Sequence, residues 1–196
     1  MGFEFTLALS EADKLDCFRI RHTVFALERK WIAPNNDGLE TDEWDEHSIS
    51  LIARDQTGKA VGTARMILDN PLGFPYEKVE ALPFGTDRTL MFEVSRLAVL
   101  PESRKCSSTI TIGLCRAIWQ YANILRLQQW VAVIDRPVVR LLSRIRFEFK
   151  YKGVPVCYLG SESIPLLCEM QASQRALFSL RLNTQLLEHC EPFSAV

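Results

Sequence analysis

The chain has 196 residues, of which 47% are hydrophobic and 24% are charged, and its formal net charge is -1. This composition is typical of a folded globular protein and excludes an intrinsically disordered chain. The sequence contains no apolar run near the roughly 20 residues of a membrane span, and its N-terminus lacks the basic start of a signal peptide. We therefore expect a single cytoplasmic domain over residues 1–196, without a membrane span.

Hydrophobic periodicity predicts the element order β-α-β-β-β-α-β-α-β-β-α. The predicted strands cover residues 3–9, 49–54, 60–68, 90–100, 129–134, 154–159 and 164–170. The predicted helices run from Ser10 to about Phe25, over 109–125, from Asp135 onward, and over 172–187. Helices that flank one mixed sheet give an α/β or α+β layer architecture.

Local signals mark several of these boundaries. Ser10 followed by Asp13 is a loose capping box, and Asp135 shortly before Pro137 is an N-cap signal. Residues 55–59 carry a hairpin turn between two strands, and residues 70–89 are rich in proline and glycine. The chain shows no internal repeat or linker, which again favours one domain.

Three blocks of charged and aromatic residues stand out along the chain. They are, in order, Arg21, Phe25 and Trp31; then Glu40, Asp42 and Asp45; then Arg65 with Glu93, Ser95 and Arg96. In this order and spacing the blocks resemble the acyl-homoserine-lactone synthases and their N-acyl amino acid synthase relatives. The resemblance covers about residues 4–160.

The resemblance implies a GNAT-like fold with a mixed, mostly antiparallel sheet flanked by helices. It also implies an acyltransferase whose donor is the acyl-phosphopantetheine of acyl carrier protein and whose acceptor is a small-molecule amine. Neither a bound cofactor nor a metal is expected. Acyl transfer from a thioester to an amine needs a deprotonated amine and a stabilised oxyanion, and it needs no nucleophile from the protein.

Glu93 is the candidate that would take the proton from the amine, directly or through water. Asp45 competes for this catalytic role. In the fold that the resemblance implies, backbone amides near 97–99 would face the thioester carbonyl. The other interpretation of Glu93 is an ion pair with Arg65 or Arg96 that holds the acidic loop in place.

The acids of the second block have a structural and a functional interpretation. The resemblance implies that Asp42 and Asp45 pair with Arg21, Arg65 or Arg96 and shape the acceptor pocket. A solvated acidic loop and a calcium loop are the alternatives, although the spacing and glycine of an EF-hand are absent. An arginine on an apolar helix face favours pairing, because an unpaired buried charge is costly.

Aromatic residues are further candidates for substrate contacts. The resemblance places Phe25 and Trp31 at the substrate pocket, whereas helical spacing alone makes Phe25 a core residue. Trp119 and several apolar strands are suited to line a tunnel for a medium- or long-chain acyl group, whose length the sequence does not reveal.

Basic residues gather in the second half of the chain. GNAT enzymes that use coenzyme A bind its pyrophosphate at a glycine-rich turn, but segment 104–109 contains no glycine. The candidates for docking an acidic carrier protein are Arg104, Lys105, Arg136, Arg140 and Arg144, the last three at i, i+4 spacing on one helix face. A solvated face is the alternative, and no nucleic-acid partner is expected because aromatic stacking positions are missing.

Two weak signals bear on the acceptor. Segment 68–77 is more similar to the N-acyl amino acid synthases than to the lactone synthases, and strand 130–134 lacks a threonine that many lactone synthases place there. We expect a free amino acid acceptor, tyrosine first. The alternatives are S-adenosylmethionine, which would give a homoserine lactone, and a non-catalytic GNAT-fold binding domain.

Overall fold

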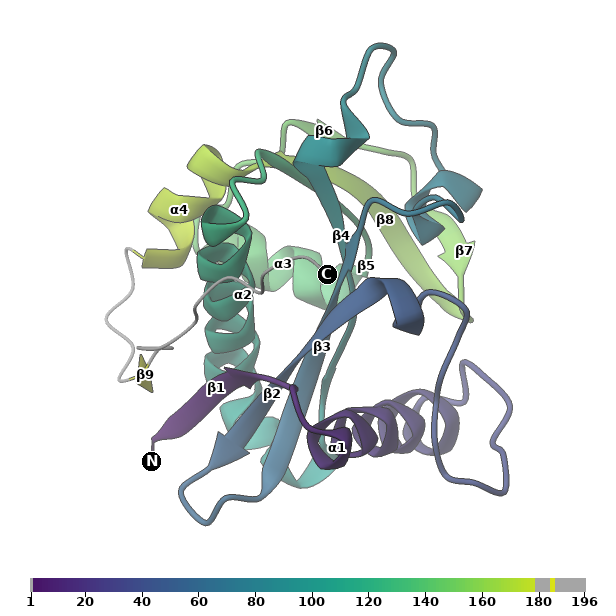
Figure 1. Cartoon of the computed structure of the whole chain (residues 1–196), viewed down its shortest axis with the longest axis vertical. Helices are drawn as coiled ribbons and strands as arrows, with labels where there is room; N and C mark the ends of the chain where they lie inside the picture. Colours follow the sequence, from purple (N-terminus) through teal and green to yellow (C-terminus); the bar gives the residue numbers. More distant parts are fainter. Residues whose placement is uncertain (1, 179–183, 186–196) are drawn as a thin grey trace.

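The computed structural model describes residues 2–178 and 184–185. Within them, nine strands form one sheet in the order β6-β8-β5-β4-β3-β2-β1-β9, with β7 paired to β8 (Figure 1). The strands are β1 (Phe3–Leu7), β2 (Ser48–Asp55), β3 (Ala60–Leu68), β4 (Met91–Val99), β5 (Gln129–Asp135), β6 (Tyr151–Lys152), β7 (Val156–Tyr158), β8 (Ser161–Glu169) and β9 (Thr184–Gln185). Only β4 with β5 and β1 with β9 pair in parallel among these strands. The predicted mixed, mostly antiparallel sheet is confirmed.

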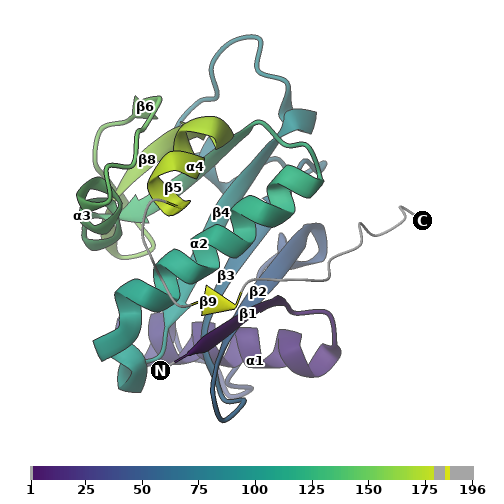
Figure 2. The ribbon, with the colours of Figure 1, turned by 90° about the vertical axis from the view of Figure 1, so that its left-hand side faces the viewer.

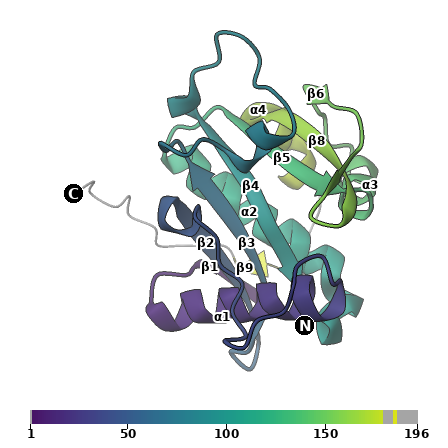
Figure 3. The same ribbon diagram turned by 90° about the vertical axis from the view of Figure 1, so that its right-hand side faces the viewer.

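Helices cover both faces of this sheet (Figures 2 and 3). They are α1 (Glu11–Arg21), which continues as a π-helical segment (His22–Glu28), and α2 (Ser107–Ile124), α3 (Arg136–Arg144) and α4 (Met170–Phe178). Helix α1 packs on one face, and α2, α3 and α4 pack on the other. No helix in the described part of the chain is long and apolar enough to cross a bilayer.

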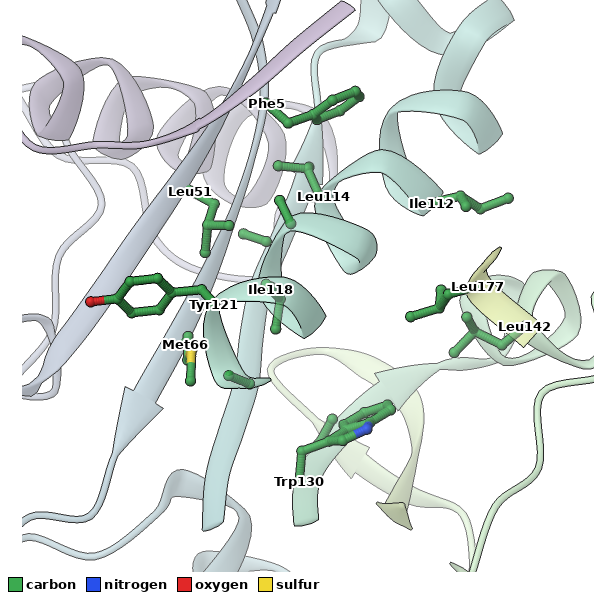
Figure 4. Packing of buried hydrophobic residues seen from close by; sticks show 14 of the residues in the cluster. Phe5, Leu51, Met66, Ile112, Leu114, Ile118, Tyr121, Trp130, Leu142 and Leu177 are labelled. Carbon is green, nitrogen blue, oxygen red and sulfur yellow. The ribbon is translucent and has the colours of Figure 1, made fainter. Parts of the chain in front are cut away.

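The alternation of side chains along the strands builds the core on both faces. Leu51 and Ala53 of β2 join the large cluster under α2, in which Figure 4 labels Leu51. Ile52 between them packs with Cys17 of α1 on the other face. Gly113 lets α2 approach β1 closely, because a Cβ at this position would lie 2.0 Å from the ring of Phe5. The runs of hydrophobic residues in the central strands therefore reflect burial of side chains on both faces of the sheet.

The C-terminal part of the prediction needs correction. The helix expected over 172–187 is α4, which begins at Met170, and Thr184–Gln185 within that span is a strand. The rest of the predicted helix lies outside the described residues. Strand β8 starts three residues before the predicted 164, because residues 161–163 pair with β7 and residue 163 pairs with β5 as well. The two-residue strand β6 and the π-helical continuation of α1 were not predicted.

Strand β4 carries an irregularity that shapes the molecule. Thr63 and Arg65 of β3 lie opposite Ala98 and Ser95, so β4 holds one extra residue between them. Arg96 in this β-bulge has a φ of 53°, a left-handed conformation that re-aims its side chain. On its other edge, β4 pairs with β5 only over Met91–Glu93. Beyond Glu93 the two strands are no longer paired, and the sheet is open there.

Candidate active site

A cavity of about 570 Å³ occupies the region where β4 and β5 separate. Phe92 and Val94 line it from the α2 side of the sheet. Glu93 and Ser95 also line it, and alternation along a strand places them on the opposite, α1 side. The cavity therefore connects the two faces of the sheet at Glu93.

The α2 side of the cavity is mainly apolar. Its wall includes Ile118, Trp119, Trp130, Leu142, Phe147 and Met170. The indole N–H of Trp130 donates to Ser173 Oγ at 3.0 Å, and that of Trp119 donates to the Met170 carbonyl at 2.9 Å. Because both polar N–H groups are satisfied by the protein, the ring surfaces are left to contact an apolar group. This half suits a hydrocarbon chain.

A closed ring of ion pairs lies beside the α1 side of the cavity. It consists of Arg21, Glu40, Arg96, Asp42, Arg65 and Asp45, each bonded to its two neighbours in this order and the last to the first. We call this set the ion-pair ring. Its members come from α1, the loop before β2, β3 and β4, so the ring joins four segments. Its three arginines and three carboxylates balance in charge.

The contacts within the ion-pair ring are short. Arg65 Nη2 donates to Asp42 at 2.9 Å and Nη1 to Asp45 at 2.8 Å, and Arg21 Nη1 donates to Asp45 at 2.6 Å. Arg96 Nη2 donates to Asp42 at 2.8 Å. Burial opposes ionisation of Asp42 and Asp45, but the arginine partners hold the pKa of both carboxyls below the usual value. Asp45 is therefore a weak base.

Glu93 has a different environment from the ring acids. Its side chain is buried, and Oε2 accepts a hydrogen bond from the Tyr76 backbone amide at 2.7 Å. Burial raises the pKa of Glu93 to about 8, although Tyr76 and the charges of Arg65 and Arg96 oppose the shift. Neither arginine forms an ion pair with it in the described part of the chain, because both bind ring acids. Glu93 is a carboxyl that exchanges its proton near neutral pH.

The aromatic candidates combine the two roles that the sequence left open, packing in the core and lining the cavity. The rings of Phe25 and Trp31 stack with centroids 5.8 Å apart and planes at 12°. Both residues line the cavity, and Phe25 also packs with Ile20 in the cluster under α1. Phe25 is thus a core residue with one side on the cavity.

The docking candidates separate into two groups. Arg104, Arg140 and Arg144 line the cavity, the last two as exposed side chains. Lys105 and Arg136 are exposed and lie outside that lining. Two of the five are already paired at 2.5 Å, Arg104 with Glu28 and Arg136 with Glu162.

Among the cavity residues that were missing from the prediction, two are titratable groups with raised pKa values. Tyr158 of β7 is half-buried, and burial raises the pKa of its hydroxyl. Asp135 caps α3 by accepting from the Val138 amide, and burial raises the pKa of its carboxyl. The N-cap signal at Asp135 was visible in the sequence, but nothing local to Tyr158 marked it as a cavity residue.

Comparisons with known proteins agree with this geometry. The family model described as "N-acyl amino acid synthase FeeM" matches residues 16–158. The acyl-homoserine-lactone synthase of Vibrio anguillarum is 24% identical over 167 residues, which cover 82% of this chain and 83% of that protein.

Solved structures with the same fold include the acyl-homoserine-lactone synthase LasI, at 19% identity and a TM-score of 0.72, covering 96% of this chain and 98% of LasI. BjaI, a coenzyme A-dependent acyl-homoserine lactone synthase, gives 20% and 0.70, covering 94% and 92%. The structure of FeeM, an N-acyl amino acid synthase from uncultured soil microbes, gives 15% and 0.63, covering 86% and 91%. These likenesses confirm the GNAT-like fold.

Proposed function

This chain belongs to the N-acyl amino acid synthase FeeM family, and from that premise we propose its reaction. The family membership makes it an acyltransferase, so the non-catalytic binding domain is set aside. In the proposed reaction it transfers a medium- or long-chain fatty acyl group from acyl carrier protein to the amine of an amino acid, with tyrosine as the first candidate. The cytoplasm, where we expect the chain to reside, stays a prediction.

One observation carries this proposal: a single cavity joins an apolar half, through the opening in the sheet, to Glu93 and Arg96. The apolar half accepts the acyl chain, and the charged half accepts the polar amine. The thioester carbonyl then lies between them, where the two strands separate. The buried carboxyl of Glu93 would then lie beside the amine and accept the proton that the amine loses.

The proposed chemistry uses few protein groups. The amine nitrogen attacks the thioester carbonyl carbon and forms a C–N bond, while its proton passes to Glu93. The C–S bond breaks, and the phosphopantetheine sulfur leaves as a thiolate that takes up a proton. A pKa of about 8 for Glu93 lies near the working pH, which suits a group that accepts and then releases a proton. Backbone amides at 97–99, after the bulge, are our candidates for the oxyanion.

Arg96 is the better candidate of two arginines for holding the acceptor carboxylate. Arg65 is 1% exposed and binds Asp42, Asp45 and Ser95. Arg96 lines the cavity and uses Nε and Nη2 for its ring partners, so within the described residues Nη1 is available for a carboxylate.

The donor assignment rests on the segment after β4. Residues 100–112 contain no glycine, so the backbone there lacks the flexible turn that cradles a pyrophosphate. Exposed Arg140 and Arg144 line the cavity instead and suit the acidic surface of a carrier protein. BjaI is coenzyme A-dependent, so both donors belong in the assay.

S-adenosylmethionine is the second candidate acceptor, favoured by the similarity to acyl-homoserine-lactone synthases. It carries the same amine and carboxylate, so Arg96 would hold it equally well. The test incubates the purified protein with acyl carrier protein or acyl-coenzyme A as the donor and either an amino acid panel or S-adenosylmethionine, with mass spectrometry of the products. We expect N-acyl amino acid and no methylthioadenosine. Methylthioadenosine and a homoserine lactone at comparable turnover would overturn the assignment.

A further inference from the structure

We propose that the tip of the β7–β8 hairpin is the wall that selects the acceptor side chain, with Leu159 as the specificity-determining residue. The proposal rests on the proposed amino acid acceptor and names the side-chain class that the same site takes. The slot that Leu159 helps to form would accept an aromatic or large aliphatic side chain and disfavour basic ones.

The first observation is the backbone of the turn. Tyr158 pairs directly with Ser161, so Leu159 and Gly160 form a two-residue hairpin loop. Both have positive φ, 46° and 73°, which is the type I′ conformation. Asn-Gly is the favoured pair for this turn, whereas leucine at the first position is strained because its Cβ crowds the backbone. A bulky apolar residue here is unfavourable for the turn itself.

The second observation explains why leucine is useful at this strained position. Leu159 is 38% exposed and lines the cavity, and apolar Trp31, Phe25 and Ile32 line the cavity as well. Trp31, Phe25 and Ile32 pack in the cluster under α1, on the face of the sheet that carries Glu93. Leu159 thus adds an apolar surface to the half of the cavity where the amine reacts.

The third observation is the contact that fixes the hairpin tip. The backbone of Gly160 lies against Trp31, since a Cβ on Gly160 would be 3.3 Å from both Cα and Cδ1 of the tryptophan. Figure 1 shows the end of β7 beside the loop that follows α1. Trp31 in turn stacks on Phe25. Two segments far apart in sequence therefore meet at this wall, and Gly160 permits the close approach.

The chemistry of the slot follows from these contacts. Arg96 and Glu93 provide the polar groups for the acceptor carboxylate and amine, Trp31 and Leu159 provide apolar surface, and the guanidinium of Arg29 lies over the ring of Trp31. A basic acceptor side chain would lose hydration against this surface and would be repelled by Arg29. An aromatic ring would stack or pack against Trp31 and Leu159.

The test is the Leu159→Asn variant, assayed with acyl carrier protein donor and separate tyrosine, leucine, alanine and glutamate acceptors. Asparagine suits the turn, so the melting temperature should stay level or rise. The KM for tyrosine should rise about tenfold through the lost apolar contact, and the preference for tyrosine over alanine should fall by a similar factor. The KM for the donor should change less than twofold.

Two further variants complete the design. Leu9→Asn is the matched control, because Leu9 is 58% exposed and lies at the far end of α1 from Phe25; all constants should stay unchanged. Gly160→Ala, which strains the turn and presses on Trp31, should raise the acceptor KM as Leu159→Asn does.

An unchanged tyrosine KM and unchanged acceptor preference in a folded Leu159→Asn protein would overturn the inference while leaving the proposed function intact. Equal increases in KM for donor and acceptor would also count against a selective wall. If the unmodified protein makes no N-acyl amino acid with any acceptor, the proposed function fails, and the identity of the product separates that outcome from failure of the wall.

Discussion

Replacement of Glu93 by glutamine tests the proposed chemistry most directly. The change keeps the shape of the side chain and leaves an oxygen to accept the Tyr76 amide bond, but it removes the ability to take up a proton. If Glu93 is the base, kcat should fall on the order of 10²- to 10⁴-fold with the fold intact. The melting curve and circular dichroism of the variant check the fold.

The raised pKa gives this prediction a pH dependence. With a pKa of about 8, roughly a tenth of the Glu93 carboxyls are ionised at pH 7, so kcat/KM should rise about tenfold between pH 7 and pH 9. One acceptor is used throughout, so that the titration of its own amine contributes equally to every variant. The part of the increase in kcat/KM that comes from ionisation of Glu93 should be absent in the Glu93→Gln variant.

Stability should change over the same range. The folded state holds the Glu93 proton up to about pH 8, while the unfolded chain releases it near 4.5. The native protein therefore loses stability as pH rises from about 4.5 to 8, by up to about 5 kcal/mol for a shift of this size. Glu93→Gln escapes this loss, so its melting temperature relative to the unmodified protein should increase with pH.

Glu4→Gln provides the control, because Glu4 is exposed on β1. It should leave the rate, the pH profile and the melting curve unchanged. An unaltered rate and pH profile in folded Glu93→Gln would refute the reasoning and assign Glu93 a structural role.

Three other predictions concern the ion-pair ring, the docking face and the core. Asp45→Asn leaves two buried guanidinium groups short of a partner, so the free energy of unfolding should fall by about 3–5 kcal/mol in denaturant titrations. Charge reversal at Arg140 and Arg144 should raise the KM for acyl carrier protein, more at low salt, in steady-state assays. Gly113→Ala forces a methyl group against the ring of Phe5 and should cost about 1–3 kcal/mol of stability.

Each of these predictions has its own control. Asp37→Asn, at an exposed position, should leave stability unchanged. Arg126→Glu reverses an exposed charge outside the cavity lining and should not affect the donor KM. If it raises that KM as much as the docking variants do, net charge and not a docking face explains the effect. A smaller residue at position 5 should restore part of the stability lost in Gly113→Ala.

The sequence allowed most of the sheet to be predicted, because the central strands alternate between two buried faces. Leu51, Ile52 and Ala53 show this well, since neighbouring residues serve different clusters. The C-terminal helix was wrong in extent because an apolar helical pattern there does not reveal that residues 184–185 pair with β1. Pairing between chain ends is a tertiary effect that no local pattern contains.

The site was predicted unevenly for a similar reason. The resemblance brought the acids and arginines into one group, but it could not show that they close into a ring. The bulge was not predicted because its residue with positive φ is Arg96 and not a glycine, the residue type that usually marks this conformation. Leu159 was missed because its partner surface includes Trp31, more than a hundred residues earlier, and only the fold brings them together.

The closed ion-pair ring limits how this protein can diversify. Every arginine in it bonds to two acids and every acid to two arginines. Replacing any one member with a neutral residue therefore removes one ion-pair partner from each of two others. With the role that we propose for Leu159, new acceptor preferences are reached most easily at the hairpin tip, where a single substitution would change the slot and disturb no member of the ion-pair ring. Laboratory evolution toward other amino acids should accumulate substitutions at Leu159 and leave the ion-pair ring unchanged.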